Sequence, residues 1–558
     1  MLLRDKRYLL LAGIVFSSLA CLGYRDLFPL LSPPAPIAGN FGQNTELLST
    51  VLLGTADVSV TAVEVSLDGA DFLPATGTTA WKFFLPTGSL TWKTGSLHTI
   101  SVRARNTNTV SPVSQYRVRK GRNQDLNGDG YADVVIGAGS YNASQGRLYI
   151  FYGSANGIPG GSIGGADRII TGEAATAGYF GGDLAIGDIN GDGYADIGVG
   201  AFDFGSGGGR AYLFHGGPTG ITQTGAAAAN TILTSDGFSN YISSPCFGDF
   251  NGDGYDDFVV GGARANVTNN RLYIYYGNAS GITSGAAQTV ANRTITPEAG
   301  LTGFGRSQSG DINNDGFSDL IVAGMVYNSS QGRVYTFMGS ATGIMNTTAA
   351  SAPSIIMGEA TSNAFGITRA TGDINGDGFA DVVIGASLYN SNTGRVYIYL
   401  GSGSGLPTGG AAAVANAIIT GENTNNDLGS AIPALIDLNR DGHLDLVLTA
   451  YTYNSSQGRA YIFNGSATGF VTMNASGANT ILTGNLLGDA FGSGTGVTDF
   501  NGDGNIDLLF AANQNTGNQG LVYLLRNGGP GFSTSGINTT SAVQITGEAG
   551  NNYLGTFP

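Results

Sequence analysis

Short apolar runs recur along residues 120–558 and share one composition. They follow one another as VVIGA, IGVGA, FVVGGA, LIVAG, VVIGA, LVLTA and LLFAA. Each is rich in β-branched or other large apolar residues and ends in Gly or Ala, which predicts a buried strand rather than a helix. After each comes a second run, such as QGRLYIFYGS, then ITGE or a variant of it, and in most units an FG pair before the next run. The pattern predicts four strands in each repeating unit.

The repeating unit is long enough for one blade of a propeller. Its members begin 61 to 64 residues apart, and there are seven of them. A single four-stranded unit cannot bury both of its faces, whereas a closed ring can. The fold class predicted is all-β, with a seven-bladed β-propeller over residues 120–558. No ITGE or FG segment precedes the first loop, and residues 545–558 (ITGEAGNNYLGTFP) have ITGE and a variant of FG with no loop after them, so this C-terminal segment is expected to complete the first blade.

Residues 40–119 have a different pattern. In VEVSLDGADF, apolar residues alternate with polar ones and end at Asp68-Gly69, a hairpin signal, and HTISVRARN alternates in the same way. Short alternating strands over some 80 residues predict a small β-sandwich of immunoglobulin type, without the Cys pair of antibody domains.

The first 39 residues resemble an export segment and a spacer. Arg4, Lys6 and Arg7 precede an apolar stretch too short to span a membrane as a helix, which predicts a signal peptide over residues 1–20. Two cleavage hypotheses remain open. SLA fits ordinary signal peptidase, and SLAC resembles a bacterial lipobox with Cys21 as the lipidated residue, although Ser18 stands where Leu is usual. We favour lipidation, with residues 21–39 as lipid anchor and Pro-rich linker. The other cysteine, Cys246, is expected to be an inert packed thiol.

A nine-residue acidic loop precedes every apolar run. DLNGDGYAD is the first, and all seven copies have Asp, Asn, Asp, Gly and Asp at positions 1, 3, 5, 6 and 9. Hard cations such as Ca²⁺ take carboxylate, amide and carbonyl oxygens, and a Gly at position 6 allows a sharp turn. A plain Asx turn would not need three carboxylates in seven copies. EF-hand loops need a Glu at position 12, where this chain has apolar residues.

These loops therefore predict about seven structural Ca²⁺ ions, with position 7 donating its backbone carbonyl and position 4 no ligand. The predicted ligands are Asp125, Asn127, Asp129, Tyr131 and Asp133; Asp188, Asn190, Asp192, Tyr194 and Asp196; Asp249, Asn251, Asp253, Tyr255 and Asp257; Asp311, Asn313, Asp315, Phe317 and Asp319; Asp373, Asn375, Asp377, Phe379 and Asp381; Asp437, Asn439, Asp441, His443 and Asp445; and Asp499, Asn501, Asp503, Asn505 and Asp507.

Composition and charge agree with this interpretation. The 91 glycines have no collagen-like period and suit a β protein with many tight turns. The formal net charge is −15, and more than half of the 40 acidic residues are in the loops. Seven Ca²⁺ ions would bring the net charge close to neutral. The absence of a basic balance argues against a nucleic-acid partner.

The repeats resemble the FG-GAP family, the seven-bladed propellers of integrin α-subunit heads and related bacterial exported proteins. The FG pair is present at Phe180-Gly181, Phe304-Gly305, Phe365-Gly366 and Phe491-Gly492, and it drifts to Leu428-Gly429 and Leu554-Gly555. The GAP end survives mainly as GA. Integrin propellers usually have fewer metal loops than blades, so a loop in every blade points to the bacterial branch. The resemblance implies Ca²⁺ in each loop, on the rim opposite the usual ligand-binding face.

Three functions remain open. The first is a calcium-stabilised binding or adhesion protein of the cell envelope, exported, lipid-anchored to the outer membrane or cell surface, with a protein or glycan ligand. The second is an enzyme that acts on polysaccharide or lipid, which the sequence supports less. Only His98, His215 and His443 are present, and no nucleophile elbow or zinc motif appears. The third is an envelope scaffold, which the sequence cannot separate from the first.

Overall fold

The chain divides into two compact units. The computed structural model describes residues 32–87, 92–173, 178–235, 242, 244–262, 270–529, 531–532, 542–548 and 553–558. The first unit holds residues up to 43, Val51–Leu85 and Leu97–Val118, and the second holds Asn44–Thr50, Pro86–Ser96 and Arg119–Pro558. The predicted signal peptide, Cys21 and most of the linker lie outside the described residues. None of the helices within the described ranges has the length and hydropathy needed to cross a membrane.

The boundary predicted at residue 119 is therefore incomplete. Residues 44–50 and 86–96 were expected in the sandwich, but they make their contacts within the second unit. Ser49 and Thr50 explain this placement, because their hydroxyls donate to the Asp125 carboxylate at 2.8 Å and the Gly193 carbonyl at 2.7 Å. Short polar segments of this kind look the same in a sequence whichever unit they contact.

The first unit contains two antiparallel sheets. One has the strand order β1-β3-β7-β6, and β9, β8, β4 and β5 are neighbours in the other. The bounds are β1 (Ile37–Ala38), β3 (Val51–Thr55), β4 (Ala62–Leu67), β5 (Leu73–Pro74), β6 (Thr76–Gly77), β7 (Ala80–Phe84), β8 (Leu97–Arg105) and β9 (Ser114–Lys120). The ring of Phe41 contacts both Trp81 of β7 and Tyr116 of β9 edge-on. The expected hairpin turn is present, with positive φ at Asp68 and Gly69.

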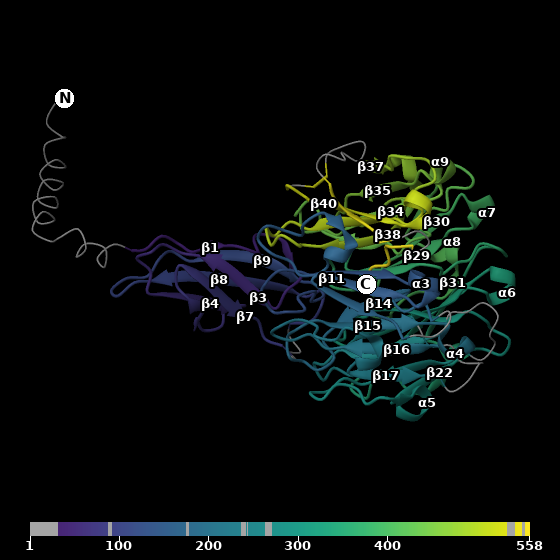
Figure 1. The fold of residues 1–558 in the computed structure, drawn as a ribbon, viewed down its shortest axis with the longest axis horizontal. Coiled ribbons are helices and arrows are strands. Elements are labelled where there is room, and N and C mark those ends of the chain that lie inside the picture. The colour runs from purple at the N-terminus through teal and green to yellow at the C-terminus, as the bar shows by residue number, and fades with distance from the viewer. Residues whose placement is uncertain are drawn as a thin grey trace, which may run out of the picture. The chain divides into compact units, whose positions relative to one another are not determined.

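The second unit contains seven sheets, one for each acidic loop, and Figure 1 shows their strands following one another in colour from blue to yellow. Their main strands are β10 (Val134–Ala138), β11 (Arg147–Phe151) and β13 (Arg168–Thr171); β14 (Asp183–Gly187), β15 (Asp196–Ala201), β16 (Arg210–Phe214) and β17 (Thr231–Thr234); β18 (Cys246–Gly248), β19 (Asp257–Gly261), β20 (Leu272–Tyr275) and β22 (Arg293–Thr296); β23 (Phe304–Gly310), β24 (Asp319–Gly324), β25 (Arg333–Phe337) and β27 (Ser354–Met357); β28 (Arg369–Gly372), β29 (Asp381–Ala386), β30 (Arg395–Tyr399) and β32 (Ala417–Thr420); β33 (Ala434–Ile436), β34 (Asp445–Ala450), β35 (Arg459–Phe463) and β37 (Thr480–Thr483); and β38 (Phe491–Thr498), β39 (Asp507–Ala512), β40 (Leu521–Leu525) and β41 (Val543–Thr546).

Short accessory elements join these sheets. The strands β12 (Gly161–Ser162), β21 (Gly285–Ala286), β26 (Thr347–Thr348), β31 (Gly409–Gly410) and β36 (Met473–Asn474) each pair in parallel with the last strand of the sheet before. The four-residue elements α3 (Tyr141–Ser144), α6 (Tyr327–Ser330), α7 (Tyr389–Asn392) and α9 (Tyr453–Ser456) are turns with left-handed residues inside them.

The apolar runs form the second strand of six sheets and strand β10 of the first, and they are buried on both faces. In β10, β15, β19, β24, β29, β34 and β39 every residue is buried, because neighbouring sheets cover both sides. Each pair of consecutive sheets shares one buried apolar cluster. A further cluster joins Val134 and Ile136 of the first sheet to Leu509 and Val522 of the seventh. This packing order closes on itself, as in a seven-bladed β-propeller.

The C-terminus takes part in this closure, but differently from the expectation. The ITGE strand, β41, pairs with β40 in the seventh sheet rather than in the first. Only the last residues reach the first sheet, where Thr556 bridges Gly137 of β10 and Figure 1 shows the C-terminus beside β11. The reason is that ITGE is the last strand of its own blade, while the FG segment begins the next blade.

We predict that Phe557→Ala lowers the free energy of unfolding by about 3 kcal/mol, the usual cost of truncating a buried Phe. Phe557 is buried over Gly494 and Gly496 of β38 and belongs to the cluster that joins the first and seventh sheets. Urea unfolding checks this. Tyr553→Ala, in the same segment but exposed, should change stability by less than about 0.5 kcal/mol. Equal effects of the two substitutions would mean that the segment does not hold the ring together.

Candidate metal centre

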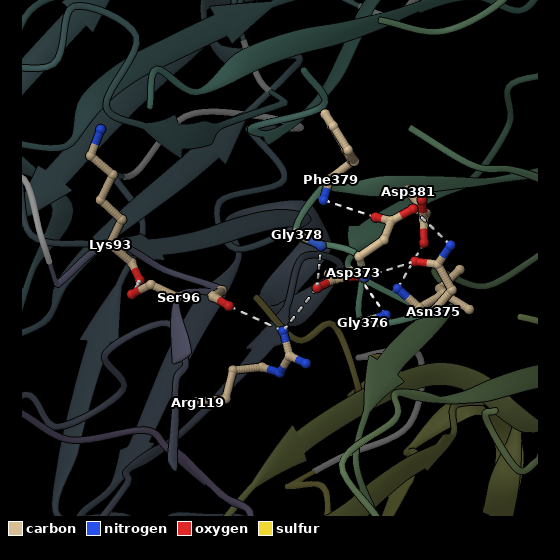
Figure 2. A network of polar contacts seen from close by, with 12 residues as sticks. Lys93, Ser96, Arg119, Asp373, Asn375, Gly376, Gly378, Phe379 and Asp381 are labelled. Carbon is tan, nitrogen blue, oxygen red and sulfur yellow. Dashed lines mark hydrogen bonds and ion pairs between the residues drawn. The ribbon is translucent and has the colours of Figure 1, made fainter. Parts of the chain in front are cut away.

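Six of the acidic loops join the first strand of their sheet to the second, and the first loop leads into β10, so the loops share one end of the seven sheets. The fifth loop illustrates the geometry: it leaves β28 at Gly372 and enters β29 at Asp381. Figure 2 shows its polar side chains turned toward its own backbone. The predicted ligand residues of each loop are thereby brought together within one turn of chain.

The first, third and fifth positions of each loop bind its backbone. In the fifth loop, Asp373 accepts hydrogen bonds from the backbone N–H groups of Gly376 at 2.7 Å, Asp377 at 3.1 Å and Gly378 at 3.1 Å. Asp377 accepts from the Phe379 N–H at 3.0 Å. The Asn375 side chain accepts from the Asp377 N–H and donates to the Asp377 carboxylate. The bonds to position 6, to position 7 and from the Asn recur in all seven loops.

The Asp at position 9 anchors each loop to its own sheet. All seven of these side chains are buried, with at most 3% of their surface exposed. In the fifth loop, one oxygen of Asp381 accepts from the Ile374 N–H at 2.7 Å and the other from the Gly401 N–H at 2.8 Å, beyond the third strand. The bond from beyond the third strand is present in every loop.

The backbone is left-handed at positions 4 and 6. At position 6 the φ of the Gly lies between 77° and 97° in all seven loops, in agreement with its expected role in the turn. Position 4 also has positive φ, including Asn314 at 54° and Arg440 at 60°. From the sequence, position 4 was expected to donate no ligand, and Arg440 and Asn314 replace the Gly there in two loops. The structure shows a backbone constraint there that favours Gly.

Position 7 also has a role that the sequence analysis missed. In four loops its side chain packs closely against position 4 of the preceding loop, so that a Cβ at Gly128 would overlap the ring of Tyr194, and one at Gly502 would overlap Tyr131. The same arrangement occurs at Gly191 and Gly252. The loops therefore contact one another in chain order, and the seventh contacts the first. The signal for this was the aromatic residue at position 7 in five of the seven loops.

Burial is the largest influence on the pKa of the loop carboxyls. Burial raises the pKa of Asp257 and Asp507 to about 8 and that of Asp319, Asp381 and Asp445 to about 7. At position 1, burial and then the neighbouring carboxylates raise the pKa of Asp188 and Asp499 to about 7. A cation between these groups would remove the repulsion and favour their ionised forms.

The donor types in each loop fit a hard cation. Carboxylates at positions 1, 5 and 9, an Asn amide oxygen and a backbone carbonyl are the oxygens that Ca²⁺ takes. In the described ranges, no three His, Cys, Asp or Glu side chains lie close enough together to hold a metal by themselves. A cation would therefore also need the Asn oxygen and the carbonyl of position 7.

Basic residues outside the repeats lie beside the loops, which the sequence did not indicate. The Arg119 guanidinium is 3.7 Å from an Asp373 oxygen and donates to the Gly95 carbonyl, as Figure 2 shows. The Lys93 ammonium lies 5.7 Å from the centre of the Phe317 ring. Burial lowers the pKa of Lys120 to about 8, against the opposing attraction of Asp256 and Asp188. These groups offset part of the negative charge at this end of the sheets.

Comparison with protein families agrees with this architecture. An FG-GAP repeat matches residues 125–151, 365–399 and 428–463, and an FG-GAP-like repeat matches 188–260 and 249–322. The chain is an FG-GAP repeat protein. These matches span six of the seven acidic loops.

Curated relatives of this chain include integrin α-subunits and a phospholipase. The chain is 34% identical to mouse integrin alpha-IIb over 166 residues, which is 28% of this chain and 15% of the integrin. It is 34% identical to mouse phosphatidylinositol-glycan-specific phospholipase D over 144 residues, 24% of this chain and 17% of the enzyme. It is 41% identical to Chinese hamster (Cricetulus griseus) integrin alpha-3 over 101 residues, 17% of this chain and 9% of the integrin. The chain thus spans less than a fifth of these relatives' length. A solved eukaryotic initiation factor structure covers 68% of this chain and 90% of its own, with 11% identity and a TM-score of 0.21, too low to indicate a shared fold.

We predict that calcium raises the melting temperature more at pH 8 than at pH 5.5. In the metal-free protein the raised pKa values mean that the folded state holds protons that the unfolded state has lost. Its stability therefore falls as the pH rises through about 7 to 8. Calcium binds the ionised carboxylates, so its effect grows over the same range. Thermal melts in calcium and in EGTA at the two pH values check this. A calcium effect that is absent, or equal at both, would contradict it.

We also predict that Arg440→Gly stabilises the protein by about 1 kcal/mol, because Gly adopts the left-handed φ of position 4 without strain. The bond that the Arg440 carbonyl accepts from Asn44 is retained. Arg440→Ala is the matched control, since it removes the same side-chain contacts and keeps the Cβ. Chemical unfolding in calcium should show a gain for the Gly variant alone. A gain of equal size in both variants would assign the effect to the Arg side chain.

Proposed function

We propose that this chain is a calcium-stabilised adhesion or ligand-binding protein. Seven Ca²⁺ ions would hold the loop end of the ring, and the opposite end would contact a protein or glycan. The observation that carries the proposal is the separation of the two ends. All seven loops lie at one end of an FG-GAP propeller. Their side chains pack against neighbouring loops and supply oxygen donors of the kind that bind a metal, which leaves the other end of the propeller free for a ligand. The integrin relatives support the same division of roles.

The strand register identifies the opposite end. Ala138, the last residue of β10, pairs with Arg147, the first of β11, so Arg147 lies far from the loop that precedes β10. The turns between second and third strands and the segments that link consecutive sheets meet here. In one such link Gly488 donates to the carbonyl of Ser455 in α9. Leu486 and Leu487 in this link are adjacent and are 60% and 65% exposed, and neighbouring exposed apolar side chains suit a contact surface.

An ion pair between neighbouring sheets stiffens this end. Arg395 donates to the Glu359 carboxylate of the preceding sheet at 2.8 Å, and the Arg395 guanidinium lies 3.7 Å from the centre of the Tyr389 ring. The Tyr397 hydroxyl donates to the same Glu359 carboxylate at 2.6 Å. Equivalent pairs link Arg147 to Glu548, Arg210 to Glu173, Arg333 to Glu298 and Arg459 to Glu422. The Arg147 pair joins the first and seventh sheets. A rigid end of this kind loses little conformational freedom when it binds a ligand.

We further propose that the protein is exported and held at a bacterial outer membrane or cell surface by lipid on Cys21. The support is the basic and apolar N-terminal sequence and the lipobox-like SLAC. Extracellular calcium would fill even weak sites of the acidic loops. Mass spectrometry of the mature N-terminus distinguishes a diacylated Cys21 from cleavage without lipid.

The enzyme hypothesis has one specific point in its favour, the likeness to a phospholipase D. The matched segment covers only 17% of that enzyme, so the likeness lies in the repeats. The histidines do not add to it. His98 pairs with Asp68 at 2.8 Å, the His215 ring lies against Gly281 with its pKa lowered by burial, and His443 is in the sixth loop. An envelope scaffold remains compatible with the same surface.

A binding assay with two variants tests the proposal. The purified chain in saturating calcium is screened for saturable binding to immobilised glycans and extracellular proteins. We expect Leu487→Asp to weaken binding about tenfold or more with an unchanged melting temperature. Asp377→Asn, in the fifth loop, should lower the calcium-dependent melting temperature and leave binding below that temperature unchanged. Asp167→Asn, an exposed acid outside the loops, is the control for loss of charge.

Other outcomes would overturn parts of the proposal. Loss of binding in Asp377→Asn without loss of stability would place calcium in the ligand contact. Hydrolysis of phosphatidylinositol-glycan by the purified chain, with no saturable binding to any partner, would replace the binding function with an enzymatic one.

A further inference from the structure

A cluster of one buried and two half-buried arginines lies where the first strands of neighbouring sheets meet. Arg306 is in β23 of the fourth sheet and Arg369 in β28 of the fifth, and these strands are joined by a bond from the Thr371 hydroxyl to the Ser309 carbonyl. Arg122, just before the first loop, also reaches this region and contacts Ser309. Neither the metal loops nor the proposed ligand surface accounts for these side chains.

Arg122 has a structural role, whereas Arg306 and Arg369 are left with unused donors. Arg122 donates to the carbonyls of Ile186 and Phe247 and to the Ser309 hydroxyl. A guanidinium has five N–H donors. Arg306 uses one on the Ile367 carbonyl at 3.3 Å, and Arg369 uses one on the Gly366 carbonyl at 2.6 Å. The Nε atoms of both are buried without a partner, and so is the hydroxyl of the adjacent Ser307.

The positive charge of this pair is also uncompensated. Arg369 is 8% exposed, and in the described part of the chain neither Arg306 nor Arg369 has a carboxylate within 4.0 Å. Burial and then the proximity of Arg306 lower the pKa of Arg369 to about 9, against a weaker attraction from Asp183. Cys246 is close by, but burial raises the pKa of its thiol and keeps it neutral.

Five arginines that recur in the repeats of this chain each form an ion pair with a glutamate. Arg147, Arg210, Arg333, Arg395 and Arg459 each have a Glu oxygen at 2.6 to 2.9 Å. A buried guanidinium without an anion is strongly destabilising, because water no longer solvates it. The positive charge of the half-buried Arg306 nearby repels the buried Arg369 as well. An anion from solution would satisfy both charges and the unpartnered donors.

We propose that Arg306, Arg369 and Ser307 form a binding site for a small tetrahedral oxyanion of the sulfate or phosphate class. Guanidinium groups present parallel N–H donors that match the oxygens of such anions, and a hydroxyl adds a further donor. Bound there, the anion would bridge the fourth and fifth sheets. This site is separate from the acidic loops and takes a ligand of opposite charge.

Sulfate titration of the full chain tests the site. Melting temperature is measured in calcium buffer as sulfate replaces chloride at constant ionic strength, with isothermal titration calorimetry alongside. The native protein should show a saturable rise on the order of 2 °C, as expected for a ligand that binds only the folded state. Arg369→Gln should abolish the saturable rise and, without sulfate, melt no lower than the native protein, because it removes an unpaired buried charge. The control Arg526→Gln, at an exposed arginine, should keep the full response.

Three results would overturn the proposal. A saturable response that persists in Arg369→Gln would place sulfate elsewhere. An unsaturable rise of equal size in all proteins would be general salting-out. A loss of stability in Arg369→Gln with an unchanged sulfate response would make the arginine purely structural. If Arg369→Gln does not fold, Arg306→Gln, at a less buried position, serves in its place with the same expected loss of the saturable response.

Discussion

The architecture depends on a carboxylate buried at the end of each acidic loop. Its two oxygens are fixed in six sheets by one N–H group from the loop and one from beyond the third strand, and in the seventh by the latter alone. Those bonds hold the loop in register with its sheet, but they do not neutralise the charge. A second and a third carboxylate share the same loop. Folding therefore buries several negatively charged carboxylates close to one another. A divalent cation bound between them would offset the repulsion between these carboxylates. We propose that stability and calcium are linked through this one constraint.

The ring is closed by contacts at the loop end, at the opposite end, and between neighbouring sheets. At the loop end, four of the position 7 side chains pack closely on the preceding loop, and among them Tyr131 completes the circle against Gly502. At the other end, Arg147 and Glu548 join the first and seventh sheets. Between them the apolar second strands share buried clusters. Since both ends are tied in chain order, the surface opposite the loops is held in one shape and suits recognition without rearrangement.

The sequence predicted most of this architecture because its strongest signals are local. Alternate Asp and Asn residues around Gly130, and the apolar run after Asp133, identify the loop and the strand without knowledge of distant contacts. The errors concern features set by residues far along the chain. Position 4 looked unconstrained because the ring that packs on it comes from the next repeat, as Tyr194 does on Gly128. Residues 44–50 were placed in the wrong unit because their hydrogen-bond acceptors lie 76 to 143 residues later. The unpaired Arg306 and Arg369 carry no sequence signal, since only the fold shows that no acid faces them.

The central claim is that the seven loops are calcium sites that the fold requires. The most direct measurement is the calcium content of the purified, folded chain after equilibrium dialysis against buffered calcium, by atomic emission spectroscopy. The account predicts about seven calcium ions for each chain, one for each loop. A variant that lacks Asp377 should hold one calcium ion fewer. A folded chain that holds no calcium under these conditions would contradict it.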